Sequence, residues 1–277
     1  MNDTPIDLGF VGRRGLIGTW RTETSLVDPG PATTVPALLR ALDGWQPQTI
    51  LLTHIHFDHA AATGELIERW PQTEVVVHAA GARHMIDPSR LWASAKRVFG
   101  DELEQRFGSM RPVPAANIRA LEGGERVAGL LAAATPGHAK HHLAFLDESS
   151  GRAYVGDVCG VALAGGPVLP PTPPPDIDLE LWRRSLGLIA AWEPRELALT
   201  HFGAIADAAA HLDAVAASLE QHERLARAND DEGYASTVRG LLAPRCDAEA
   251  IADYDLLVPL LQNARGLARA RAAADGD

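Results

Sequence analysis

One ten-residue stretch constrains this chain more than any other. Residues 50–59 read Ile-Leu-Leu-Thr-His-Ile-His-Phe-Asp-His, so an apolar, β-favouring run leads directly into four potential metal ligands. Imidazole nitrogen and carboxylate oxygen suit zinc, and also iron or manganese. Chance clustering of this density is not expected with eleven histidines in 277 residues. The stretch therefore predicts a short buried strand whose end carries a metal site, with His54, His56, Asp58 and His59 as its ligands.

The spacing of these ligands makes a further prediction. Side chains alternate between the two sides of an extended backbone. This alternation predicts that His54, His56 and Asp58 share one side, while His59 points elsewhere. Such an arrangement suits two metal ions better than one.

Composition narrows the class of protein. The chain is 46% hydrophobic and 22% charged, which is typical of a globular protein. Its net charge of −11 argues against a nucleic-acid groove, which needs a basic patch. An acidic substrate stays open, because bound divalent metals invert the local field. We expect a small-molecule substrate and no nucleic acid, and the sequence leaves a homodimer open.

The cellular location is expected to be cytoplasmic. Two cysteines, Cys159 and Cys246, form no disulfide framework, and a reduced compartment is the simplest interpretation. The first residues lack the basic and apolar regions of a signal peptide. No stretch approaches the roughly 18 uncharged apolar residues of a membrane span, so no membrane association is expected.

Strand-like and helix-like segments alternate along the first two thirds of the chain, which is typical of α/β organisation. Two blocks of strands, each with helices, predict a sandwich of two sheets covered by helices. The expected strands are 6–11, 16–20, 24–27, 50–53, 74–78, 118–121, 126–133, 142–146, 153–155 and 196–200. The expected helices before residue 205 are 33–42, 60–70, 79–86, about 89–98, 101–107 and 178–192.

The remaining sequence is rich in Ala, Leu and Arg and predicts helices at 206–228, 230–242 and 247–273. We therefore expect a core over 1–205 and a helical extension over 206–277. Two segments could border a substrate pocket, namely the irregular insertion 88–110 and the Pro-rich extended loop 165–176. For each, a packing or surface role is an equally good interpretation.

Three further polar residues follow apolar runs. His138 follows the run 130–134, Asp157 follows 153–155, and His201 follows 197–200. Ligands at the ends of rigid strands are what a well-defined metal site needs. Together with Asp28, the cluster at 54–59, and the Thr-Pro-Gly motif before His138, these residues resemble the metallo-β-lactamase-fold superfamily. The five motifs appear in order and span about two thirds of the chain.

The resemblance implies a four-layer αββα sandwich with a dinuclear site at one edge of the sheets. It assigns His54, His56 and His138 to one divalent ion, and Asp58, His59 and His201 to the other. Asp157 would bridge both ions. Asp28 would support ligands through hydrogen bonds without binding metal. His142, which starts an apolar strand, is also expected to support the site.

Within that superfamily, the Thr-Pro-Gly-His motif and His142 are most similar to the glyoxalase II-like branch, which hydrolyses thioesters. The implied mechanism uses two metal ions, with zinc preferred over iron or manganese, to activate a water molecule. Asp58 would position that water. Thioesters, esters and lactones are therefore the expected substrates. The alternative is a resemblance to persulfide dioxygenases, in which His54, His138 and Asp157 would bind a single iron.

Overall fold

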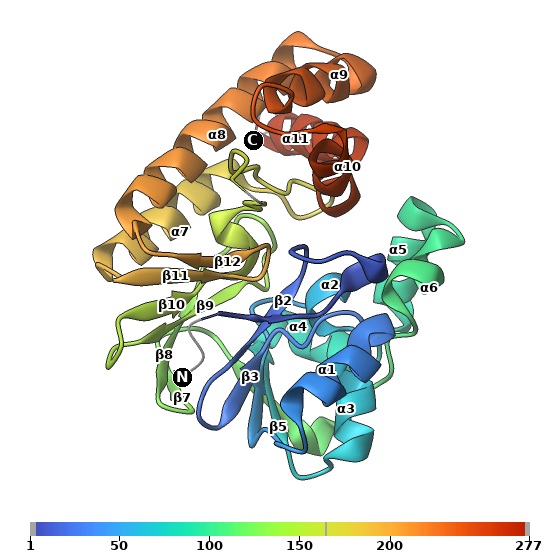
Figure 1. The fold of residues 1–277 in the computed structure, drawn as a ribbon, viewed down its shortest axis with the longest axis vertical. Coiled ribbons are helices and arrows are strands. Elements are labelled where there is room, and N and C mark those ends of the chain that lie inside the picture. The colour runs from blue at the N-terminus through green and yellow to red at the C-terminus, as the bar shows by residue number, and fades with distance from the viewer. Residues whose placement is uncertain (1–3, 164, 275–277) are drawn as a thin grey trace.

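The computed structural model describes residues 4–163 and 165–274, without the side chain of residue 98. Two mixed sheets face each other, and helices cover their outer faces (Figure 1). This arrangement confirms the predicted αββα class. The first sheet contains, in spatial order, β1 (Ile6–Asp7), β2 (Gly18–Arg21), β3 (Ser25–Val27), β4 (Thr49–Leu51), β5 (Glu74–His78) and β6 (Ile118–Leu121). The second contains β12 (Gly203–Ile205), β11 (Glu196–Leu199), β10 (Arg152–Tyr154), β9 (Leu143–Asp147), β8 (Leu130–Ala134) and β7 (Arg126–Val127).

The helices also divide into two sets, one in each half of the chain. Those of the first half are α1 (Val35–Leu42), α2 (Phe57–Ala60), α3 (Thr63–Arg69), α4 (Ala79–Ile86), α5 (Ser89–Phe99) and α6 (Glu102–Phe107). Those of the second half are α7 (Leu179–Ala191), α8 (Ala208–Ala228), α9 (Asp231–Leu242), α10 (Ala248–Leu257) and α11 (Leu260–Ala274). Short 3-10 turns occur at Phe10–Gly12, Ala32–Thr34, Ala115–Asn117 and Gly156–Cys159. No described helix combines the length and apolar character needed to cross a membrane.

The alternation of side chains along the strands explains why the molecule has two outer hydrophobic cores, under the helices, and one inner core between the sheets. In β5, Val76 belongs to the core between the sheets, whereas Val75 and Val77 belong to the core under the helices of the first half. In β9, Phe145 faces the inner core and Ala144 faces α7 and α8. Both faces of each of these strands are thus buried, which explains their apolar sequences. Each large side chain buried in this way contributes about 1.5–3 kcal/mol.

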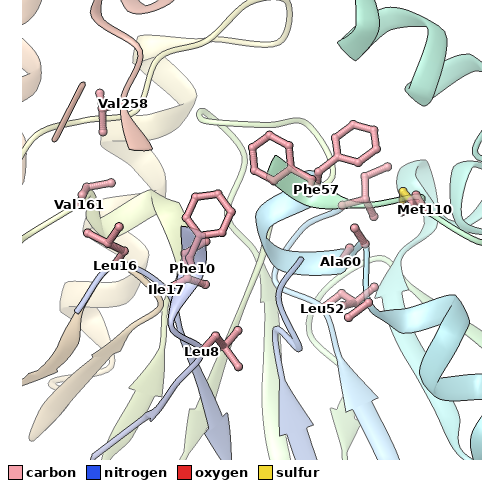
Figure 2. Packing of buried hydrophobic residues seen from close by; sticks show 14 of the residues in the cluster. Leu8, Phe10, Leu16, Ile17, Leu52, Phe57, Ala60, Met110, Val161 and Val258 are labelled. Atoms are coloured by element: carbon pink, nitrogen blue, oxygen red, sulfur yellow. The ribbon is translucent and has the colours of Figure 1, made fainter. Parts of the chain in front are cut away.

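The C-terminal helices pack against the first half of the molecule. One continuous core contains Tyr234 and Leu267 together with Leu8 and Phe10 near the N-terminus. Figure 2 shows part of this cluster, in which Val258 lies near Val161 and above Leu16. The loop 165–176 lies between the helices and the sheets, as Figure 1 shows in yellow. That packing places the C-terminal helices at the sheet edge where the predicted metal ligands gather.

The predicted secondary structure needs correction in several places, among them the strand expected at 126–133, which is a hairpin of β7 and β8. The helix expected at 60–70 is two helices, because the amide of Ala62 donates to the Gly30 carbonyl and leaves the helical hydrogen-bond ladder. The helix expected at 247–273 is also two, α10 and α11, because Pro259 cannot continue a helix. Strand β12 was not predicted, and it pairs antiparallel with β11 through a turn at residues 200–202.

Candidate metal centre

The seven predicted ligands meet at one edge of the sandwich. Four of them follow β4, directly or at the start of α2, and the other three come from the second sheet, after β8, β10 and β11. The carboxyl ends of these strands point the same way, so their loops converge. The residues form two compact groups, one with His54, His56, His138 and Asp157, the other with Asp58, His59 and His201. Within each group the candidate ligand atoms all lie within 4.8 Å of one another.

In the first group three imidazoles turn a nitrogen to a common point. The Nδ1 atom of His56 lies 3.0 Å from His54 Nε2 and 2.9 Å from His138 Nε2. His54 and His138 are almost fully buried, and His56 is partly exposed. This exposure leaves one side of the group open to a ligand from outside.

In the second group the two imidazoles meet through their Nε2 atoms, 3.2 Å apart. Asp58 Oδ2 lies 3.4 Å from the Nε2 of His201 and 3.7 Å from that of His59. The predicted alternation of side chains is wrong for Asp58, which does not join His54 and His56. The reason is local. Helix α2 begins at residue 57, so Asp58 and His59 are no longer on an extended backbone.

Asp157 lies between the groups and offers one oxygen to each. Its Oδ2 atom is 3.4 Å from His138 Nε2 and 3.9 Å from His54 Nε2. Its Oδ1 atom is 3.2 Å from His59 Nε2 and 3.5 Å from His201 Nε2. This Oδ1 is buried and has no hydrogen-bond partner among the described residues. A buried carboxylate oxygen without a partner is costly unless a cation completes its surroundings.

Backbone carbonyl groups fix the outward nitrogens of two imidazoles. His138 Nδ1 donates to the Pro171 carbonyl over 2.7 Å, and His201 Nδ1 donates to the Leu16 carbonyl over 2.9 Å. A carbonyl only accepts, so each Nδ1 carries a proton, and each ring in its neutral form presents an Nε2 lone pair inward. This is the hydrogen-bonding pattern that orients metal-binding histidines.

Asp28 organises the other side of the centre. It is fully buried, and its Oδ2 accepts from His59 Nδ1 over 2.8 Å and from Thr200 Oγ1 over 3.0 Å. Thr53 donates to the same carboxylate from its amide, over 2.8 Å, and from its hydroxyl, over 2.7 Å. Because that hydroxyl proton is used, Thr53 Oγ1 accepts from His54 Nδ1 over 3.1 Å. Asp28 adopts a left-handed φ of 50°, a strained conformation that these bonds hold in place.

Charge differs between the two groups. Burial, followed by the neighbouring histidines, lowers the pKa of His54 well below its usual value and that of His56 to about 3. Burial also opposes a charge on His59, but Asp157, Asp58 and Asp28 raise its pKa well above the usual value. The same surroundings attract positive charge to the second group. A divalent cation satisfies both the inward lone pairs and the carboxylates of Asp58 and Asp157, so the donor set fits a metal centre.

Two neighbouring histidines belong to the walls of the centre. His142 is fully buried, stacks on His54 with ring centroids 5.1 Å apart, and pairs with Thr135 Oγ1 over 2.8 Å. His141 is buried and lies 5.8 Å from the ring of His56. Neither is in the two ligand groups. His142 therefore lies where the sequence predicted a supporting residue.

Sequence reasoning missed the residues that hold the Pro-rich loop. Asn263 of α11 is fully buried, accepts from the Thr172 amide over 2.8 Å and donates to the Pro170 carbonyl over 2.9 Å. The carbonyl between them, at Pro171, is the acceptor for His138. A lone Asn in an Ala- and Arg-rich helix carries no signal of this role.

A cavity of about 150 Å³ opens onto the centre. The insertion 88–110 and the loop 165–176, whose roles the sequence left open, both line it. Leu91, Ala95 and Phe99 come from the insertion, and Pro171 and Pro173 from the loop.

An αββα sandwich with two adjoining His/Asp groups at its edge is the arrangement expected of a protein that could hold metal ions. The model of the metallo-beta-lactamase superfamily matches residues 21–201, and the chain belongs to that superfamily. It is 27% identical over 191 residues to the metallo-beta-lactamase fold-containing protein ST1585 of Sulfurisphaera tokodaii, covering 66% of this chain and 69% of that protein. It is also 27% identical over 149 residues to the uncharacterized protein YobT of Bacillus subtilis, covering 52% and 62%.

Solved structures agree on the fold. The crystal structure of ST1585 covers 96% of this chain and 97% of its own, with a TM-score of 0.68 and 22% identity. The metallo-beta-lactamase family protein TTHA1429 from Thermus thermophilus covers 99% and 93%, with a TM-score of 0.70 and 22% identity. TTHA1623, solved in a di-iron-bound form, is 26% identical, covers 69% and 89%, and gives a TM-score of 0.53.

Proposed function

We propose that this protein is a metal-dependent hydrolase that holds two divalent ions and cleaves a thioester, an ester or a lactone. The observation that carries the proposal is the position of Asp157, with one carboxylate oxygen facing each ligand group. Membership of the superfamily supports metal-dependent hydrolysis in general. That the cleaved bond is a thioester, an ester or a lactone is a more specific claim, which belongs to this proposal alone.

In this proposal His54, His56 and His138 would hold one ion, Asp58, His59 and His201 would hold the other, and Asp157 would contribute to both. Two bound ions would supply an acidified water and an electrophile for a carbonyl oxygen. We favour zinc, because nitrogen-rich ligand sets suit it. Iron stays a candidate, since TTHA1623 was solved in a di-iron-bound form on a similar fold.

The chain's own residues have three tasks in the reaction. Asp58 and His56 border the cavity, so they meet the substrate. Asp58 would orient the attacking water and accept a hydrogen bond from it at the carboxylate. The carbonyl groups of Pro171 and Leu16 would keep two imidazoles in the tautomer that binds metal. Asp28 would do the same for His59.

A second candidate activity is a persulfide dioxygenase with one iron on His54, His138 and Asp157. The compactness of the first ligand group favours it. The second group supports two ions, because Asp58, His59 and His201 bring three further candidate ligand atoms together outside the set that a single iron would use.

The test is turnover by protein reconstituted with zinc or with iron, against S-lactoylglutathione, an acyl-homoserine lactone and a neutral aryl ester. His56→Ala is expected to lose metal and to abolish hydrolysis. His84→Ala, on α4 and outside both groups, is the matched control and should keep both. Hydrolysis by His56→Ala at full metal content would refute the site. Oxygen consumption with glutathione persulfide and one iron per chain would favour the second activity.

A further inference from the structure

The cavity beside the metal centre has two chemically distinct parts. Its inner end consists of four residues of the centre, His56, Asp58, His138 and Asp157. Every remaining wall is apolar or uncharged, and none of the described residues that line it is Lys or Arg. For a chain with 25 Lys and Arg residues, the lack of both from the described lining is informative about the substrate.

One wall is aromatic. The ring of Phe107 lies 5.7 Å from that of Phe10, 6.2 Å from that of Phe57 and 5.5 Å from that of Phe99, measured between centroids. These four residues come from three separate parts of the chain, namely the N-terminal turn, α2 and the helices α5 and α6. Figure 2 labels Phe10 and Phe57 in this buried cluster. Packing this dense gives the wall a fixed shape, suited to an alkyl chain or an aryl ring.

The facing wall is also apolar. It is built by the prolines of the loop, by Leu256 and Leu257 at the end of α10, and by Pro259. Asn263 reaches this wall, but its amide oxygen and nitrogen are both used by the loop backbone. Ser94 and Gln262 are the other uncharged polar side chains of the described lining. Hydrogen bonds from this wall can therefore be few.

The nearest lysine in the sequence, Lys140, does not change this picture. It follows His138 by two residues but is absent from the described lining, and its amine pairs with Asp176 over 3.3 Å. An anionic group placed against these walls, away from the metal centre, would lose its hydration without gaining a cation from the described lining, which is strongly unfavourable. The charged ends of glutathione or of a phosphorylated thiol have no partner in these walls as far as the structure describes them.

We propose that the substrate carries an uncharged, apolar acyl or aryl group that fills this cavity while its ester-type carbonyl meets the metal centre. The inference rests on the proposed function and adds to it the class of substrate. It favours neutral esters, lactones and thioesters of small neutral thiols over thioesters of charged carriers. Phe99, at the end of α5, is a specificity-determining residue in this account.

The kinetic test compares aryl esters with acetyl, butanoyl and hexanoyl groups. It also compares the hexanoyl ester with the adipoyl ester, in which a carboxylate replaces the terminal methyl group. In the zinc-loaded enzyme, kcat/KM should rise about fourfold per methylene group, the equivalent of about 0.8 kcal/mol. The adipoyl ester should be at least tenfold poorer than the hexanoyl ester. If all esters were hydrolysed at rates independent of acyl length and charge, this inference would be overturned, while the proposed hydrolase function would still hold.

A binding measurement keeps the inference testable even if no ester is cleaved. Calorimetry would measure the Kd of N-methylhexanamide and of its analogue with a terminal carboxylate. The neutral compound should bind at least tenfold more tightly, and Phe99→Ala should remove most of that difference. Leu188→Ala, an exposed leucine on α7, is the control and should leave both values unchanged. Equal binding of the two compounds, or tighter binding of the anion, would overturn the proposal. Absence of turnover together with the expected binding would instead count against the hydrolase.

Discussion

Replacing Asn263 by alanine tests how the C-terminal helices hold the metal centre. The side chain is fully buried and bonds the loop backbone on both sides of Pro171. The change leaves the Thr172 amide and the Pro170 carbonyl without their partner. Each unsatisfied buried group costs about 1–3 kcal/mol, so the variant should lose about 2–6 kcal/mol of unfolding free energy.

The same variant should weaken metal binding. The Pro171 carbonyl accepts from His138 Nδ1, so a looser loop holds that imidazole less firmly. Loss of a partner directly bonded to a ligand typically costs about 10–100-fold in affinity, and an effect through one further residue should be roughly tenfold. Chelator competition measures this affinity in the folded protein.

Denaturant unfolding of the metal-free protein measures the stability separately. Arg269→Ala, an exposed change on the same helix, is the control and should stay within about 0.5 kcal/mol of the parent. A loss below about 0.5 kcal/mol for Asn263→Ala would refute the loop argument. Unchanged metal affinity at reduced stability would confine Asn263 to a structural role.

Two further predictions concern stability. Burial lowers the pKa of His222, bonded to Tyr234 on α9, to about 4. The unfolded chain therefore binds the extra proton first, and as pH falls from about 6.5 to about 4 the parent should lose about 3 kcal/mol more than His222→Gln. Equal losses in denaturant titrations at pH 7 and pH 4 would contradict this. Gly266→Ala places a Cβ 1.8 Å from the Thr172 carbonyl oxygen and should lower the melting temperature. Gly240→Ala places its Cβ in open space and should raise the free energy of unfolding by up to about 1 kcal/mol. Melting curves that rank the two variants the other way round would contradict the predicted contact.

The strand pattern made the fold predictable. Apolar runs such as 74–78 are short, β-branched and bounded by turn residues, and the structure has β5 over those residues. Helix α4 also has its predicted bounds. The points at which helices are interrupted were harder to predict. The interruption between α2 and α3 depends on a hydrogen bond to Gly30, which is distant in the sequence. Pro259, by contrast, is a local signal for the interruption between α10 and α11, and the prediction of one helix over 247–273 did not take it into account.

The sequence indicates which candidate ligands gather at the sheet edge, but not which groups support them. His138, Asp157 and His201 each stand at a strand end, a position that sequence reveals. Backbone carbonyl groups, such as those of Leu16 and Pro171, have no sequence signature at all. His222 lies in a run that predicts only a helix, and nothing in that run indicates that the residue is buried and bonded to Tyr234 of α9. The cavity walls come from loops and helices whose meeting depends on the whole fold.

The central claim is that two ions occupy the two ligand groups and share Asp157. Elemental analysis of the reconstituted, gel-filtered protein measures this claim most directly. The account predicts two divalent ions per chain for the parent, with tight retention of both dependent on the Asp157 carboxylate. A parent protein that binds only one ion per chain at saturation, with Asp157→Ala retaining the same amount, would contradict it.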